Sequence, residues 1–208
     1  MQKLLDICTK YAVEHHILFN AVKSQCLIVR SRHFDCLPVI FYLSGAPLVF
    51  INEYKYLGHI ITDTLTDDHD MLKQTRSLYA RANMLIRRFS SARHMTKCLL
   101  FNSFCTPIYG CQLWCRYNAQ TVNKLRVAYN DALRLLLQVP RWTRASQLFV
   151  DCRLPTFEAL LRKHKFSLLN AIRQSTNVLL RSFVASDLYL RSKLMQKWRL
   201  DLKPPTAH

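Results

Sequence analysis

The sequence predicts an α+β fold, with a small partial sheet and one helix followed by a long helical region. Five short apolar runs, bounded by turn-forming or polar residues, lie in the first third of the chain. From about residue 66 onward, apolar residues instead recur every three or four positions, which is the helical period. Half of the 208 residues are hydrophobic, so the chain can bury a sizeable core.

The first third is expected to begin with an amphipathic helix over residues 2–15. One face of this helix would carry Leu4, Leu5, Cys8, Tyr11 and Ala12. Short strands should follow at residues 17–19, 25–30, 38–43, 47–51 and 55–61. The segment Ser44-Gly45-Ala46-Pro47 predicts a turn between the third and fourth of these strands.

The first helix of the second region is predicted from about residue 67 to Phe89. Thr66 or Asp67 can cap it, and Asp70 would lie in its first turn, near the positive end of the helix dipole. We prefer this capping role for the acids to a metal-binding one. Apolar side chains of the helix cluster on one side: Met71, Thr75, Leu78, Ala82, Leu85 and Phe89. The opposite side carries five basic residues with no acid between them, as expected of a face that follows phosphates: Lys73, Arg76, Arg81, Arg87 and Arg88.

Three further helical regions follow this one. The first covers about 94–116, with an interruption at Pro107. The second covers about 120–137, with Val122, Leu125, Tyr129, Ala132 and Leu136 facing the core, and ends before Pro140. The third covers about 155–175 and leaves basic residues for solvent or phosphate: Arg162, Lys163, Lys165 and Arg173. In the linker between the last two regions, Trp142 could stack on a base or cover an edge of the core. The tail beyond Leu202 is expected to fray.

The charge of the chain is strongly positive and unevenly distributed. The net charge is +17, of which residues 1–68 contribute −1 (6 basic, 7 acidic) and residues 69–208 contribute +18 (24 basic, 6 acidic). This asymmetry predicts a polyanionic partner for the second part, with nucleic acid favoured over a membrane surface. Such binding should weaken with salt, because each neutralised phosphate releases counterions.

Several function classes are excluded by composition. Only three glycines are present, so no glycine-rich phosphate loop can form. The longest apolar run, residues 37–51, is shorter than a membrane-spanning helix, and charged residues interrupt the N-terminal apolar stretch, so no signal peptide is expected. We therefore expect an intracellular chain, in the cytoplasm or nucleus, without a small-molecule substrate. Cys111 and Cys115 share a helical face, but no neighbouring pair completes a zinc site, and buried free thiols are expected instead.

An ordered series of segments resembles the C-terminal part of the reverse transcriptase of non-LTR (LINE-type) retrotransposons. "LLDICTKYAVEHHILFNAVKSQC" resembles the segment called motif D, and "YKYLGHII" resembles motif E, the primer grip. "LYARANMLIRRF" and "LFNSFCTPIYGCQLW" resemble the thumb helices, and "KLRVAYNDALRLLLQVPR" resembles the region after them. The resemblance thins after about residue 175.

The resemblance implies roles for particular residues. Tyr54, Tyr56, Leu57 and Gly58 would form a tight hairpin that holds the primer end. The five basic residues of the thumb helix would bind an RNA or RNA–DNA duplex through its phosphates. Lys23 matches the motif D lysine near the phosphates of the incoming nucleotide, and a loop lysine in solvent is the equally open alternative.

The resemblance also implies a domain order: a partial palm over 1–65, a helical thumb over 66–138 and a helical extension over 139–208. Polymerases of this family hold Mg²⁺ with palm carboxylates upstream of motif D. No metal or cofactor is therefore expected in this chain, which we interpret as a reverse-transcriptase fragment without polymerase activity of its own. A repurposed nucleic-acid-binding or protein-interaction module is the main alternative. An enzyme completed by another chain and a triad hydrolase have less support.

Overall fold

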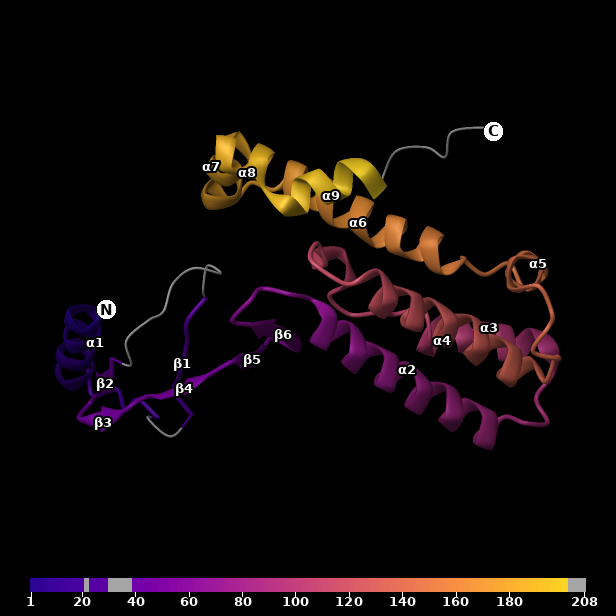
Figure 1. Ribbon diagram of the computed structural model, residues 1–208, viewed down its shortest axis with the longest axis horizontal. Coiled ribbons are helices and arrows are strands. Elements are labelled where there is room, and N and C mark those ends of the chain that lie inside the picture. The colour runs from indigo at the N-terminus through magenta and orange to yellow at the C-terminus, as the bar shows by residue number, and fades with distance from the viewer. Residues whose placement is uncertain (21–22, 30–38, 202–208) are drawn as a thin grey trace. The chain divides into compact units, whose positions relative to one another are not determined.

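The computed structural model describes residues 1–20, 23–29 and 39–201, apart from the side chains of the last two of these residues (Figure 1). They form two compact units, Met1–Thr66 and Asp67–His208, and each unit is described here by itself. The predicted α+β class is confirmed, since short strands in small sheets accompany a mostly helical chain. No helix in the described part of the chain is both long and apolar enough to cross a membrane.

Within the residues that the structure describes, the first unit contains one helix and three two-stranded sheets. Strand β1 (Gln25–Leu27) runs parallel to β4 (Val49–Ile51), with Cys26 opposite Phe50. Strands β2 (Tyr42–Leu43) and β3 (Ala46–Pro47) form a short antiparallel pair around the predicted turn at Ser44–Gly45. Strands β5 (Glu53–Tyr56) and β6 (His59–Thr62) form an antiparallel hairpin. The predicted strand at 55–61 is thus two strands, because the chain reverses at Leu57–Gly58.

Helix α1 (Gln2–Glu14) forms where it was predicted, but it packs through a different face. Ala12 is buried, whereas Leu4 and Tyr11 are more than half exposed. Polar contacts position the helix on β2: the Gln2 side-chain amide bonds the backbone N–H and C=O of Tyr42, and Thr9 Oγ1 accepts from the Ser44 N–H. The strand predicted at 17–19 does not form; these residues are irregular coil. The predicted strand ends at Arg30 and Pro38 lie outside the described residues.

The second unit is helical. Its elements in chain order are α2 (Asp68–Arg88), α3 (His94–Phe104), the 3₁₀ turn η1 (Cys111–Leu113), α4 (Ala119–Leu137), α5 (Ala145–Asp151), α6 (Phe157–Gln174), α7 (Val178–Ala185), α8 (Asp187–Arg191) and α9 (Lys193–Asp201).

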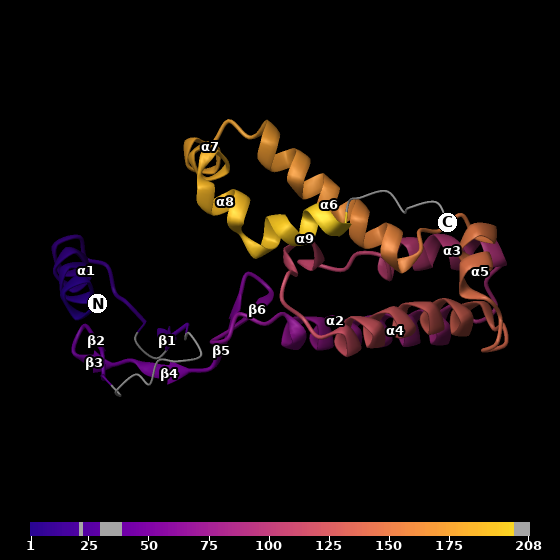
Figure 2. The same ribbon diagram turned by 45° about the horizontal axis from the view of Figure 1, so that its top comes forward.

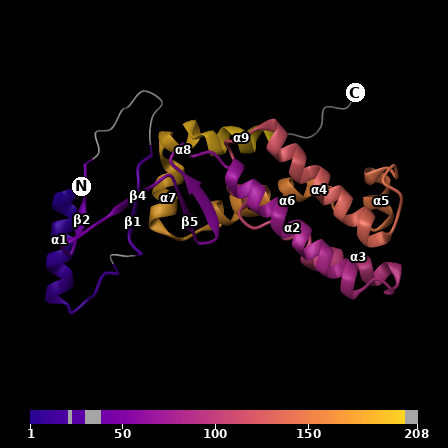
Figure 3. The same ribbon diagram turned by 60° about the horizontal axis from the view of Figure 1, so that its bottom comes forward.

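Helices α2 and α4 form the centre of this unit. They run side by side in the same direction, so their C-terminal ends lie at the same end of the unit (Figures 2 and 3). Between them and the flanking helices, Tyr129 stacks on Phe149 with ring centroids 5.2 Å apart, and Phe101 packs against both rings. These aromatic side chains are almost fully buried, and burial of such rings is a large favourable term in folding.

In the helical region predicted at 94–116 with an interruption at Pro107, α3 ends at Phe104 and only the 3₁₀ turn η1 follows the proline. Proline restricts the residue before it to extended backbone, and Gly110 then adopts φ +78°, a conformation that an L side chain rarely takes. The following turn η1 leads into Trp114, which is buried. By contrast, the helix predicted at 120–137 is confirmed almost to the residue as α4, and Gln138 ends it in the left-handed conformation (φ +58°).

A second, smaller core lies under the C-terminal helices. It contains Leu169, Tyr189, Met195 and Trp198. The indole N–H of Trp198 donates to the backbone carbonyl of Gln112 at 3.0 Å, which joins α9 to η1. The predicted fraying beyond Leu202 concerns residues outside the described part of the chain.

Candidate nucleic-acid interface

The β5–β6 hairpin presents two tyrosines on one face. Tyr54 lies opposite Ile61 and Tyr56 opposite His59, and side chains two apart in a strand point the same way. Tyr54 is 39% exposed and Tyr56 57% exposed. Their rings and hydroxyls are therefore accessible to a ligand.

The turn of this hairpin is strained. Both of its central residues, Leu57 and Gly58, have positive φ, at 45° and 85°. A type I′ turn requires positive φ at both central residues. It is favoured in two-residue hairpins because its backbone twist matches that of the flanking strands. Glycine adopts them readily, whereas a leucine there costs of order 1–2 kcal/mol. The Leu57 side chain is also 74% exposed, so packing of this side chain does not explain why a leucine occupies the strained position.

A cavity of about 590 Å³ brings predicted site residues of the first unit together. Lys23, Tyr54 and Tyr56 all line it, alongside apolar side chains such as Leu43 and Ile51. The parallel β1–β4 pair makes this possible, because it places the segment that follows Lys23 beside the strand that precedes the hairpin. A cation and two phenols around an apolar cavity suit a ligand that has both an anionic group and a flat ring.

Fewer basic side chains of α2 are exposed than the sequence predicted. Arg76, Arg87 and Arg88 are exposed. Arg76 and Arg87 are eleven positions apart, which at 100° per residue places them about 20° from each other around the helix. Tyr79, Ala80 and Asn83 are exposed as well. These residues, Arg76, Tyr79, Ala80, Asn83 and Arg87, are called the α2 stripe below.

The other two predicted residues of α2 make contacts inside their own unit. Arg81 donates to the backbone carbonyl of Pro107 at 2.9 Å, and the Lys73 ammonium lies 3.8 Å from the buried carboxylate of Asp70. On α6, Lys165 is 3% exposed, so the prediction that it is left for solvent or phosphate is wrong. Helical spacing alone could not separate these cations from the outward ones.

The acids before and within the first turn of α2 hold a distant segment of backbone. The Asp67 carboxylate accepts hydrogen bonds from the N–H groups of Cys115 and Arg116, at 2.8 and 2.7 Å. Asp68 accepts from the Asn118 N–H at 2.9 Å, and Asp70 accepts from the Trp114 indole N–H at 2.9 Å. Asp67 is the N-cap residue of α2, but its side chain makes no capping bond, so the predicted cap is wrong in this respect. These partners lie 44 to 50 residues away, which is why the sequence pattern missed them.

Two known proteins are similar in sequence to part of this chain. Over 144 residues, 67% of the chain, the sequence is 27% identical to the "Probable RNA-directed DNA polymerase from transposon BS" of Drosophila melanogaster. Over 168 residues, 78% of the chain, it is 24% identical to the "RNA-directed DNA polymerase from mobile element jockey" of Drosophila funebris. A region of the chain is thus similar in sequence to these two RNA-directed DNA polymerases. It matches 16% and 18% of the lengths of these two relatives. No protein-family profile matches the chain, and no solved structure matches it.

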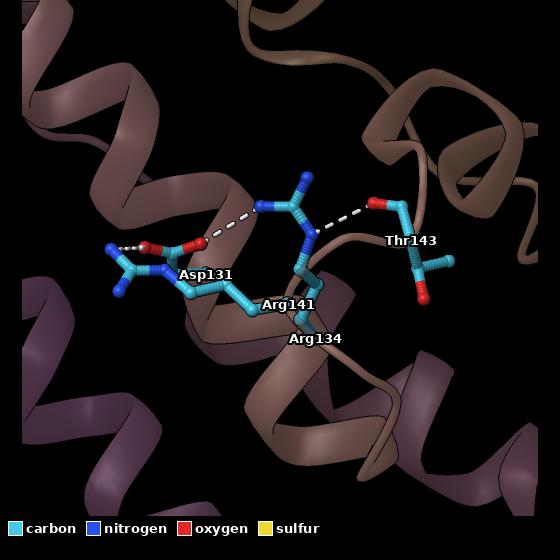
Figure 4. Close-up of polar contacts among 4 residues, drawn as sticks. All are labelled: Asp131, Arg134, Arg141 and Thr143. Carbon is cyan, nitrogen blue, oxygen red and sulfur yellow. Dashed lines mark hydrogen bonds and ion pairs between the residues drawn. The ribbon is translucent and has the colours of Figure 1, made fainter.

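The chain exposes an aromatic side chain among arginines after α4. Arg134 donates through Nη1 to Asp131 at 2.8 Å and through Nε to the Thr143 carbonyl at 3.0 Å, and Arg141 lies 3.9 Å from Asp131 (Figure 4). These contacts anchor the loop on both sides of Trp142, which is 86% exposed. Trp142 therefore does not cover the core, and its ring is accessible from solvent. The loop lies at the same end of the unit as the last turn of α2, which carries Arg87 and Arg88 (Figure 1).

Most cysteines of the second unit are buried free thiols, as expected. Burial raises the pKa of the Cys111 thiol from 9.0 to about 12 and that of Cys105 to about 11. Both thiols are therefore protonated at neutral pH. In the described part of the chain, Cys111 and Cys115 belong to no cluster of metal-ligating side chains, and the one such cluster is formed by His94, Cys98 and Cys152.

Proposed function

We propose that this chain is the C-terminal part of a retrotransposon reverse transcriptase, spanning motif D, the primer grip, the thumb and the region that follows. In this proposal the helical unit binds RNA or an RNA–DNA duplex through its backbone phosphates. The β5–β6 hairpin would hold the primer end. The similarity to two polymerases of mobile elements supports the ancestry, and the geometry of the two units supports the separate roles.

The observation that carries the binding proposal is the α2 stripe. It places Arg76 and Arg87 on one line, with the small side chain of Ala80 and the polar side chain of Asn83 between them. Arginine forms paired hydrogen bonds to phosphate, and a small residue between arginines lets a helix approach a backbone closely. Contacts of this kind recognise duplex shape and need no base sequence.

Trp142 supports the same proposal at a second position. Its loop is held by Asp131 and Arg134, and Arg141 and Arg144 lie one and two positions from Trp142 in the sequence. A flat ring beside cations suits a single-stranded or terminal base, which stacks while its phosphate meets an arginine. We propose that this loop contacts an unpaired nucleotide next to the duplex.

In the first unit, Lys23, Tyr54 and Tyr56 supply groups that fit a primer terminus. The lysine ammonium suits a phosphate, and the tyrosine rings suit the sugar and base. We propose that the Leu57–Gly58 turn sets the direction of these tyrosines. The strain at Leu57 is consistent with a conformation retained for contact with a ligand rather than for stability.

The residues described do not fit the catalytic Mg²⁺ ions of the family. Magnesium requires several oxygen ligands, whereas Asp67, Asp68 and Asp70 all accept hydrogen bonds from the 114–118 segment. The one metal-ligating cluster within the described ranges consists of histidine and cysteine, which suit softer metals. We therefore propose that this chain alone does not extend a primer.

Duplex binding can be measured by fluorescence anisotropy with a labelled RNA–DNA hybrid over a series of salt concentrations. The double variant Arg76→Gln/Arg87→Gln should bind more weakly. It should also reduce the slope of log K against log salt by roughly 1.8, at about 0.9 per phosphate contact. The matched control is Arg162→Gln/Lys163→Gln, which removes two exposed charges from α6. Equal losses in the two double variants would show that only net charge matters and would refute the α2 stripe as the binding face.

One observation favours a protein-interaction module as the second candidate function. On α7 and α8, Val178, Leu179 and Leu188 are 73%, 80% and 77% exposed. Exposed apolar side chains in such density are typical of interaction surfaces. Sedimentation velocity of the wild type and of Leu179→Gln/Leu188→Gln would test this. A self-association that the double variant abolishes supports the module, and identical sedimentation of the two proteins argues against it.

A further inference from the structure

Three potential metal ligands lie together at one end of α3. His94 is the first residue of this helix and Cys98 lies one turn further along it. Cys152 directly follows the last residue of α5, more than fifty positions later in the chain. The ligand atoms of the three side chains all lie within 4.8 Å of one another. The distance from Cys98 Sγ to His94 Nδ1 is 3.7 Å.

These distances fit a tetrahedral metal. Zinc bonds to thiolate sulfur at about 2.3 Å and to imidazole nitrogen at about 2.0–2.1 Å, so tetrahedral neighbours lie roughly 3.5–3.8 Å apart. The His94–Cys98 distance falls in this range. The Cys152 sulfur lies within 4.8 Å of both other ligand atoms, so the third ligand needs little movement to join them.

We propose that His94, Cys98 and Cys152 bind a zinc ion, which links the start of α3 to the end of α5. The two cysteines are buried and His94 is exposed, so the fourth position of the metal faces solvent and takes a water molecule. A site with three protein ligands and one water is an established arrangement for zinc. The site has no part in the proposed nucleic-acid contacts.

The chemistry of the ligands favours zinc over harder cations. Two sulfurs and one imidazole nitrogen select soft or borderline metals, and magnesium or calcium would require oxygen instead. On binding, each of the two thiols releases its proton to solvent, so one Zn²⁺ replaces two protons. The charge of the metal and the charges of the two thiolates then sum to zero.

The structural consequence is a crosslink between segments that are distant in sequence. The site lies beside the aromatic core, since Cys98, Phe101, Phe149 and Cys152 belong to one buried cluster. A ligand that binds only the folded state stabilises it by mass action. Zinc should therefore raise the unfolding temperature of the protein, and chelation should lower it.

The test uses the full chain purified under reducing conditions without chelator. Cobalt(II) added to the metal-free protein should give the visible absorption bands of a tetrahedral site and a thiolate-to-cobalt charge-transfer band, at one cobalt per chain. Zinc should displace the cobalt. His94→Asn should weaken cobalt binding by at least about tenfold, because the nitrogen ligand is lost. Since His94 is exposed, this variant is expected to fold.

Cys152→Ser should lose the charge-transfer intensity of one thiolate. The matched control is Cys115→Ser, a half-buried cysteine outside the cluster, which should bind cobalt as the wild type does. The proposal is overturned if the wild type gives no thiolate-to-cobalt band. It is also overturned if Cys152→Ser and His94→Asn both give a band as strong as that of the wild type. The same holds if zinc leaves the unfolding temperature of the wild type unchanged.

Discussion

The indole N–H of Trp114 donates a hydrogen bond of 2.9 Å to the carboxylate of Asp70, and both side chains are almost completely buried. Asp67 and Asp68 hold the backbone of the next residues, Cys115 to Asn118, at the same helix end. The cluster of acids at the start of α2 is thus a structural support for the connection between η1 and α4. These bonds give the acids that precede the basic helix a structural role.

The Asp70–Trp114 bond leads to a stability prediction. Trp114→Phe keeps an aromatic ring but removes the donor to a buried carboxylate, and it should lower the free energy of unfolding by about 1–3 kcal/mol. Urea unfolding followed by far-ultraviolet circular dichroism measures this. Trp142→Phe is the matched control, because that ring is 86% exposed, and it should change stability by less than about 0.5 kcal/mol. Equal stability of the Trp114→Phe variant and the wild type would contradict the assigned role.

The strained hairpin turn gives a prediction with the opposite sign. Leu57→Asn should stabilise the hairpin by about 1 kcal/mol, because asparagine tolerates the left-handed conformation better than leucine. Slower amide hydrogen exchange at Tyr56 and His59 would report the gain. Leu57→Ala is the control: alanine keeps the steric penalty and should bring no such gain. A Leu57→Asn hairpin that exchanges faster than the wild type would show that the leucine side chain stabilises the turn.

A loss of duplex affinity in Leu57→Asn, despite a more stable hairpin, would indicate that the Leu57 side chain contacts the nucleic acid. This outcome would separate the proposed primer-grip role from a purely structural one. It follows the general observation that strain persists where a function depends on it.

Buried thiols make the second unit sensitive to alkaline pH. In the folded state, burial raises the pKa of Cys111 from 9.0 to about 12 and that of Cys105 to about 11. In the unfolded chain these thiols ionise near their ordinary pKa, so above it the unfolded state binds fewer protons than the folded state. Stability is therefore fully present below about pH 9 and falls as the pH rises toward 11, by up to about 1.4 kcal/mol per pH unit per thiol.

Urea unfolding at about pH 8 and about pH 10.5 tests this linkage. Cys111→Ala should show a shallower loss of stability with pH than the wild type, whatever its stability at neutral pH. Cys8→Ala is the control, since Cys8 is an exposed thiol of the first unit. The linkage is wrong if the Cys111 variant and the wild type lose stability in parallel.

Local pattern accounted for much of the fold. The helical period placed Met71, Leu78, Ala82 and Leu85 of α2 in the core, and all four are buried. The positions of apolar residues over two or three helical turns show which side of a helix is apolar, and that side is buried because exposing it to water is unfavourable. A short window of sequence is therefore enough to predict the buried side.

Short apolar runs were less informative. The run at 17–19 forms no strand, and in the helical region predicted at 94–116 with an interruption at Pro107, no α-helix follows the proline. A strand needs a partner to pair its backbone groups, and a short run does not contain that information. The cavity lined by Lys23, Tyr54 and Tyr56 could not be predicted either, because it depends on the pairing of β1 with β4.

The sequence by itself determined the α+β class, the change from strands to helices near residue 66, and the concentration of positive charge in the helical part. Tertiary structure alone decided which charges face outward: Arg76 and Arg87 are exposed, whereas Arg81 bonds the Pro107 carbonyl and Lys165 is buried. It also brought His94 and Cys98 together with Cys152. The physical reason is that periodicity fixes an angle around a helix axis, whereas the groups that meet a side chain at that angle come from distant parts of the chain.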